Sequence, residues 1–176
     1  MGLESFVSNV ENTVEKLRAN QATNFEKTFQ NNNIDGVKPR HIPTINEGMV
    51  GMSVNGVKFA RRIFVLDGEK VEGVFPVFDS KFDCKLPKDL YTASDNEQMK
   101  YCTKKLAERI ERDPKFAKRF TSRQLEQIKN GEPRISGLTW HHNEIPGKMQ
   151  LVDANEHNAA RHTGGRSIWG GGSDNR

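Results

Sequence analysis

The first hydrophobic pattern in the chain has helical spacing. Apolar residues three and four positions apart predict one face of a helix within residues 3–27. They are Leu3, Val7, Val10, Val14 and Leu17. Residues 20–43 contain Asn-Asn-Asn-Ile-Asp-Gly and two prolines, a composition that favours a loop or linker. We therefore expect residues 1–45 to form an N-terminal helix and linker ahead of a main domain of residues 46–176.

Strand patterns begin near residue 49. Three runs with β character, MVGMSV, VKFARRIFVL and KVEGVFPVF, are separated by Asn55-Gly56 and Asp67-Gly68. Both dipeptides are typical of two-residue hairpin turns, because their residues tolerate positive φ. The pattern therefore predicts a three-stranded β-meander.

The period becomes helical again at Ser94. Glu97, three residues later, completes the signature of a capping box, and Pro114 ends the helix that follows. Four apolar residues share one face of this helix: Met99, Cys102, Leu106 and Ile110. Thr121 and Gln124 have the same capping spacing and predict a second, short helix.

The C-terminal region predicts a strand, a loop, a strand and a helix. Residues 137–142 and 148–152 have strand patterns and flank a loop with a Pro-Gly pair. Asp153 is a good helix N-cap, and Glu156 three residues later strengthens the signal. With the upstream meander and helices, this order indicates an α+β fold.

Composition limits the class of protein. The chain has 176 residues, of which 34% are hydrophobic and 28% charged, which suits one globular domain with a core. No run approaches the roughly 18 apolar residues of a membrane-spanning helix. The first residues also lack the basic and apolar regions of a secretory signal peptide. We therefore expect no membrane segment and no export by that route.

The positive charge is concentrated in one region. The net charge is +4, and basic residues outnumber acidic ones between Lys100 and Arg134. Such an excess suits a nucleic-acid phosphate backbone, although a solvated helix surface explains the charge equally well. The two cysteines, Cys84 and Cys102, are too few for a disulfide scaffold and lack C-x-x-C spacing, so we expect buried thiols.

Four of the five histidines fall close to the C-terminus: His141, His142, His157 and His162. In a strand-loop-strand-helix unit, the end of the first strand and the helix converge, so imidazoles far apart in sequence can reach one cation. Adjacent residues of a strand point to opposite faces, so His141 and His142 cannot easily bind the same ion. We expect a ββα-metal finger over residues 137–165, in which one residue of the doublet has a different role.

This region resembles the HNH, or His-Me finger, nucleases, and within them the bacterial toxin domains that carry a Trp-His-His motif. Four segments carry the resemblance: Trp140-His141-His142, Met149-Gln150-Leu151-Val152, His157 and His162-Thr163-Gly164-Gly165. The runs GVFPVFDSKF and RSIWGGG are similar to the same toxins, which extends the resemblance over most of residues 57–172.

The resemblance implies a role for each histidine of the cluster. His141 would be a metal ligand, completed by His157 and His162, and His142 would be the general base. A neutral imidazole with a pKa of about 6.5 can take a proton from water near neutral pH. A divalent cation stabilises charge on the phosphate and on the departing 3′ oxygen.

Two further residues are candidates for the site. Arg161, and secondarily Arg166, has the guanidinium geometry to hold a neighbouring phosphate. The central Asn of the family has no clear counterpart, and Gln150 is the nearest amide on the second strand. We include Gln150 among the catalytic candidates and leave its role open.

The spacing of two candidate ligands requires a break in the helix. His157 and His162 would lie about 140° apart around an unbroken helix, so both could not bind one ion. We expect the helix to end near Arg161. We expect Thr163-Gly164-Gly165 to turn His162 back towards the metal, with the glycines at positive φ.

The resemblance implies a metal-dependent endonuclease that hydrolyses phosphodiester bonds in nucleic acid, with DNA favoured. It would be the C-terminal toxin module of a bacterial antibacterial effector, delivered into the cytoplasm of a target cell and held inactive by a cognate immunity protein. Cleavage of RNA is one alternative, and a zinc-stabilised nucleic-acid-binding module without activity is another. The ion stays open, because imidazoles favour zinc, nickel or cobalt, whereas magnesium and manganese prefer oxygen ligands.

Overall fold

The structure is a computed structural model that describes residues 38–175. The helix expected within residues 3–27 lies outside the described residues. All of the described residues except Lys38 belong to one compact unit, Pro39–Arg176. The boundary expected after residue 45 falls inside this unit. No helix within residues 38–175 is long and apolar enough to cross a membrane.

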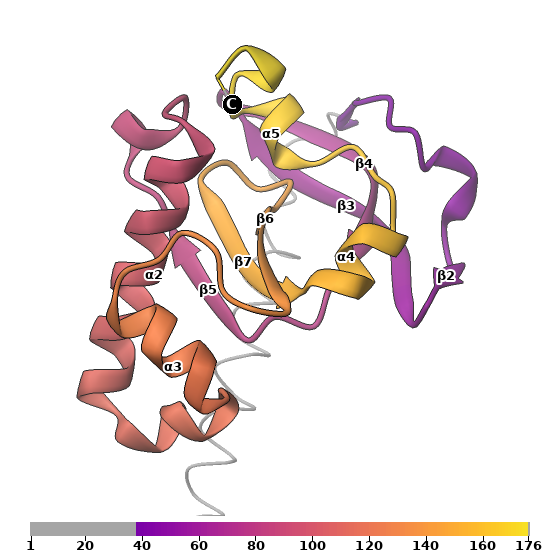
Figure 1. Ribbon diagram of the computed structural model, residues 1–176. Coiled ribbons are helices and arrows are strands. Elements are labelled where there is room, and N and C mark those ends of the chain that lie inside the picture. The colour runs from indigo at the N-terminus through magenta and orange to yellow at the C-terminus, as the bar shows by residue number, and fades with distance from the viewer. Residues whose placement is uncertain (1–37, 176) are drawn as a thin grey trace, which may run out of the picture. The chain divides into compact units, whose positions relative to one another are not determined.

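The first sheet contains the predicted meander of β2, β3 and β4 (Figure 1), and its strand order is β1-β4-β3-β2. β2, β3 and β4 are antiparallel neighbours, which confirms the meander, and β1 adds a short parallel strand beside β4. The bounds are β1 Arg40–His41, β2 Ser53–Val54, β3 Val57–Leu66 and β4 Glu69–Val77. β2 is shorter than predicted because the chain before it forms the 3-10 helix η1 (Glu47–Met49).

Both predicted hairpin turns have the expected backbone. Asn55 and Gly56 have φ of 46° and 85°, and Asp67 and Gly68 have φ of 51° and 85°. Positive φ at both central residues is the type I′ geometry, whose twist matches that of the flanking strands. These two turns therefore set the register of β2, β3 and β4.

The second sheet has the order β5-β7-β6 and is antiparallel throughout. Its strands are β5 Phe82–Lys85, β6 Leu138–His142 and β7 Lys148–Asp153. β6 and β7 are the strands predicted around the Pro-Gly loop, and β5 extends their hairpin by one strand that the sequence pattern did not reveal. His141 lies directly opposite Gln150 in this sheet.

Two capped helices follow β5, as predicted. Ser94 and Glu97 form a capping box at the start of α2 (Asp95–Arg112), and Thr121 and Gln124 form one at the start of α3 (Ser122–Lys129). The remaining short helices in this region are η2 Lys88–Leu90 and η3 Pro114–Arg119.

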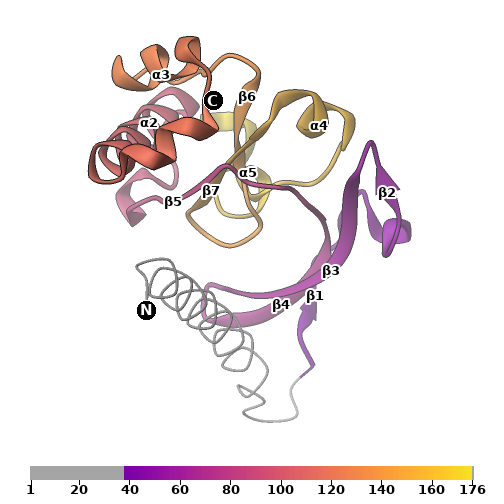
Figure 2. The ribbon, with the colours of Figure 1, turned by 90° about the horizontal axis from the view of Figure 1, so that it is seen from below.

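The second sheet is covered on both faces. Figure 2 shows α2 and α3 on one side of β5, β6 and β7, and the curved β3–β4 hairpin on the other side. On the helical side, Cys102 and Leu106 of α2 pack in one core with Trp140 and Leu151. On the other side, Val152 packs in a second core with residues of the first sheet. Since side chains alternate along β6, His141 and His142 enter different surroundings.

The chain around the expected domain boundary contacts the finger. The buried side chain of Asn46 donates through Nδ2 to the carbonyl oxygen of Arg161 at 2.9 Å. The backbone N–H of Ile45 donates to Oγ1 of Thr163 at 3.2 Å. These contacts hold the segment before β2 against the loop that carries His162.

Candidate metal centre

The finger has the predicted order of strand, loop, strand and helix. Asp153 caps α4 (Ala154–Ala159) by accepting hydrogen bonds from the backbone N–H groups of Asn155 and Glu156. α4 carries His157, and the backbone after it carries His162 back towards β6.

Three imidazoles converge from these elements. One nitrogen each from His141, His157 and His162 lies within 4.8 Å of the others. Nδ1 of His141 and Nε2 of His162 are 3.3 Å apart. The structure thus brings together the three residues for which the sequence predicted metal binding.

The return of His162 does not use the glycines as expected. α4 ends at Ala159, close to the predicted point, and Ala160 leaves the helix with φ of −89° and ψ of 71°. Gly164 has φ of −99°, and Gly165 does not adopt positive φ either, so that part of the prediction is wrong. Nδ1 of His162 instead donates to the carbonyl oxygen of Ala160 at 2.5 Å, which aims Nε2 at His141.

The packing around position 165 leaves space only for glycine. A Cβ atom at this position would lie 2.0 Å from the carbonyl oxygen of Asn143 and 2.3 Å from Nε1 of Trp169. Trp169 donates to that carbonyl at 2.8 Å. Glycine at this position therefore lets the chain after His162 pass close to the loop between β6 and β7.

Phe78, directly after β4, lies against all three imidazoles. Its ring centroid is 4.8 Å from that of His141, 5.4 Å from that of His157 and 5.6 Å from that of His162. Phe78 is buried in the core between the two sheets. Sequence reasoning missed this residue, since its pattern matches that of any core aromatic at the end of a strand.

The surroundings of the cluster lower the pKa of all three imidazoles. Burial, followed by the neighbouring rings of His162 and His157, lowers the pKa of His141 well below its usual range. Burial and His162 lower the pKa of His157 to about 4. Burial also lowers the pKa of His162, although the Ala160 carbonyl and the Glu144 charge oppose this shift. A neutral ring keeps the lone pair that a metal ligand needs.

The three residues fit a divalent cation. Two nitrogens bound to a tetrahedral ion at about 2.0–2.1 Å lie about 3.3 Å apart, the spacing found between His141 and His162. The Nδ1–H of His162 is tied to a backbone carbonyl, an arrangement that commonly orients metal-bound histidines. Three imidazole nitrogens within 4.8 Å of one another are therefore a donor set that suits a zinc-like ion.

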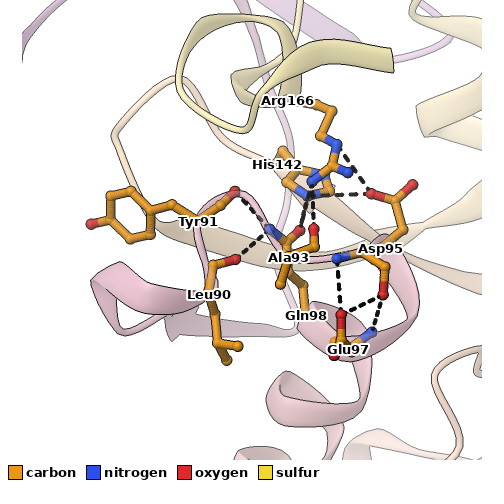
Figure 3. A network of polar contacts seen from close by, with 9 residues as sticks. Leu90, Tyr91, Ala93, Asp95, Glu97, Gln98, His142 and Arg166 are labelled. Atoms are coloured by element: carbon orange, nitrogen blue, oxygen red, sulfur yellow. Dashed lines mark hydrogen bonds and ion pairs between the residues drawn. The ribbon is translucent and has the colours of Figure 1, made fainter. Parts of the chain in front are cut away.

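His142 lies on the other face of β6, as predicted. It is buried, and its Nε2 is 2.6 Å from Oε1 of Gln98, near the start of α2. Oδ1 of Asp95 is 3.9 Å from the same nitrogen. Figure 3 shows His142 beside Gln98, Asp95 and Arg166. Although His141 and His142 face apart, both line one cleft of about 460 Å³.

The two arginines of the cleft differ in their surroundings. Arg161 is exposed and lines the cleft. Arg166 is buried, and its Nη1 donates to the carbonyl oxygen of Ala93 at 3.1 Å and to Oε1 of Gln98 at 3.3 Å. Its Nε lies 3.3 Å from Oδ1 of Asp95. Arg161 is therefore better placed to meet a phosphate.

Gln150 does not point into the cleft with the histidines. Its Oε1 accepts from Nδ2 of Asn143 at 2.9 Å, and its Nε2 donates to Oδ1 of Asp83 at 3.2 Å. Asn143 directly follows His142 and begins the loop between β6 and β7. Gln150 thus ties this loop to the edge strand β5.

Two basic residues of α2 pair with acidic residues three or four positions further along the chain. Lys105 pairs with Glu108 at 2.8 Å, and Arg109 pairs with Asp113 at 3.0 Å. These pairs neutralise part of the charge, and a nucleic-acid track over this surface stays a prediction. Both cysteines are free and buried, as expected.

Comparison with known proteins identifies one family. A family model described as the DNase/tRNase domain of colicin-like bacteriocin matches residues 67–164, more than half of the chain. No curated protein and no solved structure matches the chain. The matched segment begins at the turn between β3 and β4 and includes all four clustered histidines.

Proposed function

The chain belongs to the family of DNase/tRNase domains of colicin-like bacteriocins, and on that premise we propose that it is a metal-dependent endonuclease of the HNH type. Membership of this family establishes that the chain is a nuclease toxin domain. The metal-dependent class rests on one observation, the convergence of three imidazoles, with one nitrogen of each within 4.8 Å of the others, in the cleft that His142 also lines.

We assign the metal to His141, His157 and His162. A bound divalent ion would supply Lewis-acid stabilisation of charge on the scissile phosphate and the leaving oxygen. The backbone turn at Ala160 and the ring of Phe78 orient these three residues before the ion binds.

We assign the general base to His142. Its place on the opposite face of β6 separates it from the ligands, so its ring can accept a proton from the attacking water while the other three histidines hold the ion. Arg161, exposed in the cleft, binds a neighbouring phosphate of the substrate. Gln150 positions His142 indirectly, through Asn143 in the loop.

DNA is the first candidate substrate and RNA the second, since the family description covers both DNase and tRNase domains. Delivery from a producing bacterium into the cytoplasm of a target cell follows from the toxin class. From the same toxin class we infer a cognate immunity protein that masks the cleft.

A cleavage assay tests the proposal. Purified protein is incubated with supercoiled plasmid and, separately, with transfer RNA, each with EDTA and with added zinc, nickel, manganese or magnesium. We expect phosphodiester cleavage that EDTA abolishes and a divalent ion restores. Cleavage that persists in EDTA would refute the metal-dependent class. Binding of nucleic acid without cleavage under every condition would favour a zinc-stabilised binding module.

A further inference from the structure

A buried amide contacts the residue assigned as the base. Gln98 has no exposed surface, and its Oε1 lies 2.6 Å from Nε2 of His142. It is the fourth residue of α2 (Figure 3), and the capping box of Ser94 and Glu97 holds the first turn of this helix. The start of the helix therefore places this amide beside the ring.

The orientation of the Gln98 amide is determined by its other contacts. Its Nε2 donates to the carbonyl oxygens of Leu90 and Tyr91 at 2.7 and 2.8 Å, which uses both amide hydrogens. A flipped amide would place an oxygen against two carbonyl oxygens. Oε1 therefore faces His142 and also accepts from Nη1 of Arg166.

An oxygen at 2.6 Å requires a hydrogen on Nε2 of His142, because a lone pair on each atom would repel. When the ring is neutral, its basic lone pair is then on Nδ1. We propose that Gln98 is a positioning residue that holds His142 in the Nε2–H tautomer, so that proton transfer uses Nδ1. This inference rests on the proposed function only in that His142 is the base.

The neighbouring charged pair supports this arrangement. Nη1 of Arg166 donates to Oε1 of Gln98 at 3.3 Å, and Nε of Arg166 lies 3.3 Å from Oδ1 of Asp95. A buried guanidinium cannot accept a hydrogen bond, so it also prevents Oε1 from exchanging places with the amide nitrogen. Arg166, held by Asp95, thus stabilises the orientation of Gln98 in which Oε1 accepts from His142.

The proposed contact is separate from the metal site. Gln98 touches the face of β6 that packs on α2, whereas His141 points to the other face, beside Phe78. Loss of Gln98 should therefore leave metal affinity unchanged. This separation distinguishes a positioning role from a general weakening of the finger.

Nitrogen-15 NMR of the histidine rings in metal-free protein tests the tautomer directly. The His142 signals are assigned by their loss in His142→Ala, and spectra are recorded where the ring is neutral. We expect a protonated-type shift for Nε2 and an unprotonated-type shift for Nδ1. The opposite pattern in the unaltered chain would overturn the inference, whether or not the protein cleaves nucleic acid.

Two substitutions at position 98 isolate the acceptor. Both Gln98→Leu and Gln98→Glu remove the donors to Leu90 and Tyr91, but only Gln98→Glu keeps an oxygen for Nε2–H. We expect Gln98→Leu to mix the tautomers and lower kcat by about 10- to 100-fold, with KM and zinc affinity unchanged. Gln98→Glu should keep the Nε2–H signature.

Thr103→Val is the matched control. It removes another buried hydrogen bond between α2 and β6, from Nε1 of Trp140 to Oγ1 of Thr103 at 3.2 Å. We expect Thr103→Val to retain the Nε2–H signature and kcat. An equal fall in kcat for Thr103→Val and Gln98→Leu, with no change of tautomer, would reduce Gln98 to a packing residue and overturn the inference.

Discussion

Substitution of one clustered histidine at a time should separate metal binding from proton transfer. In His162→Ala the site loses the nitrogen that lies 3.3 Å from Nδ1 of His141. In His142→Ala the three converging nitrogens stay in place, because His142 lies on the other face of β6. We expect the first variant to lose metal and the second to retain metal without cleaving.

The expected size of the effect follows from binding linkage. Zinc at 100 times its dissociation constant should stabilise the unaltered chain by about 2.7 kcal/mol, which for this chain length raises Tm by about 5–11 °C. If His162→Ala weakens zinc binding by about 100-fold, the same zinc concentration stabilises by only about 0.4 kcal/mol and raises Tm by about 1–2 °C. His142→Ala should show the full zinc-dependent shift and a loss of cleavage of about 10²- to 10⁴-fold.

Thermal unfolding with and without zinc, beside a plasmid cleavage assay, measures both quantities on the same preparations. Calorimetric zinc titration supplies the dissociation constants. If His142→Ala loses its zinc-dependent shift as fully as His162→Ala, then His142 is a ligand and His141 becomes the better candidate for the base. If both variants still cleave, the active site lies elsewhere in the chain.

Three further outcomes are expected. Arg161→Gln should weaken DNA binding and reduce its salt slope by about one while leaving zinc affinity intact; an unchanged slope would remove Arg161 from the substrate site. Since the folded-state pKa of His157 is about 4, below its ordinary 6.5, the unfolded chain binds more protons between these values. Urea unfolding in EDTA should therefore show stability falling as pH falls through this window, with a shallower slope in His157→Asn. Phe78→Ala should cost about 3–5 kcal/mol in chemical unfolding and weaken zinc binding; unaltered zinc affinity would mean that Phe78 only fills space.

Features set by neighbours in sequence could be predicted from the sequence alone. The capping box at Ser94, the turns at Asn55 and Asp67 and the N-cap at Asp153 all depend on contacts within a few residues. Strand alternation likewise predicted that His141 and His142 would face apart. The α+β fold and the finger follow from these local preferences.

Recognition of the motif predicted which histidines converge, but not how His162 returns. The turn at Ala160 and the donation from His162 to its carbonyl replace the expected turn at the glycines. Gly165 is needed for the approach of Asn143 and Trp169, which lie on other elements. Such a steric requirement exists only once those elements have packed.

The surroundings of the site depend on tertiary packing. Gln98 is separated from His142 by 44 positions, and no local pattern distinguishes it from any polar residue in the first turns of a helix. Phe78 reaches the imidazoles only because the two sheets pack face to face. Arg166, expected as a second phosphate ligand, is instead buried beside Asp95 and Gln98. The sequence alone determined the local elements and the residue types able to bind a metal, whereas the packing of α2 and the β3–β4 hairpin on opposite faces of β6 decided the surroundings of each histidine.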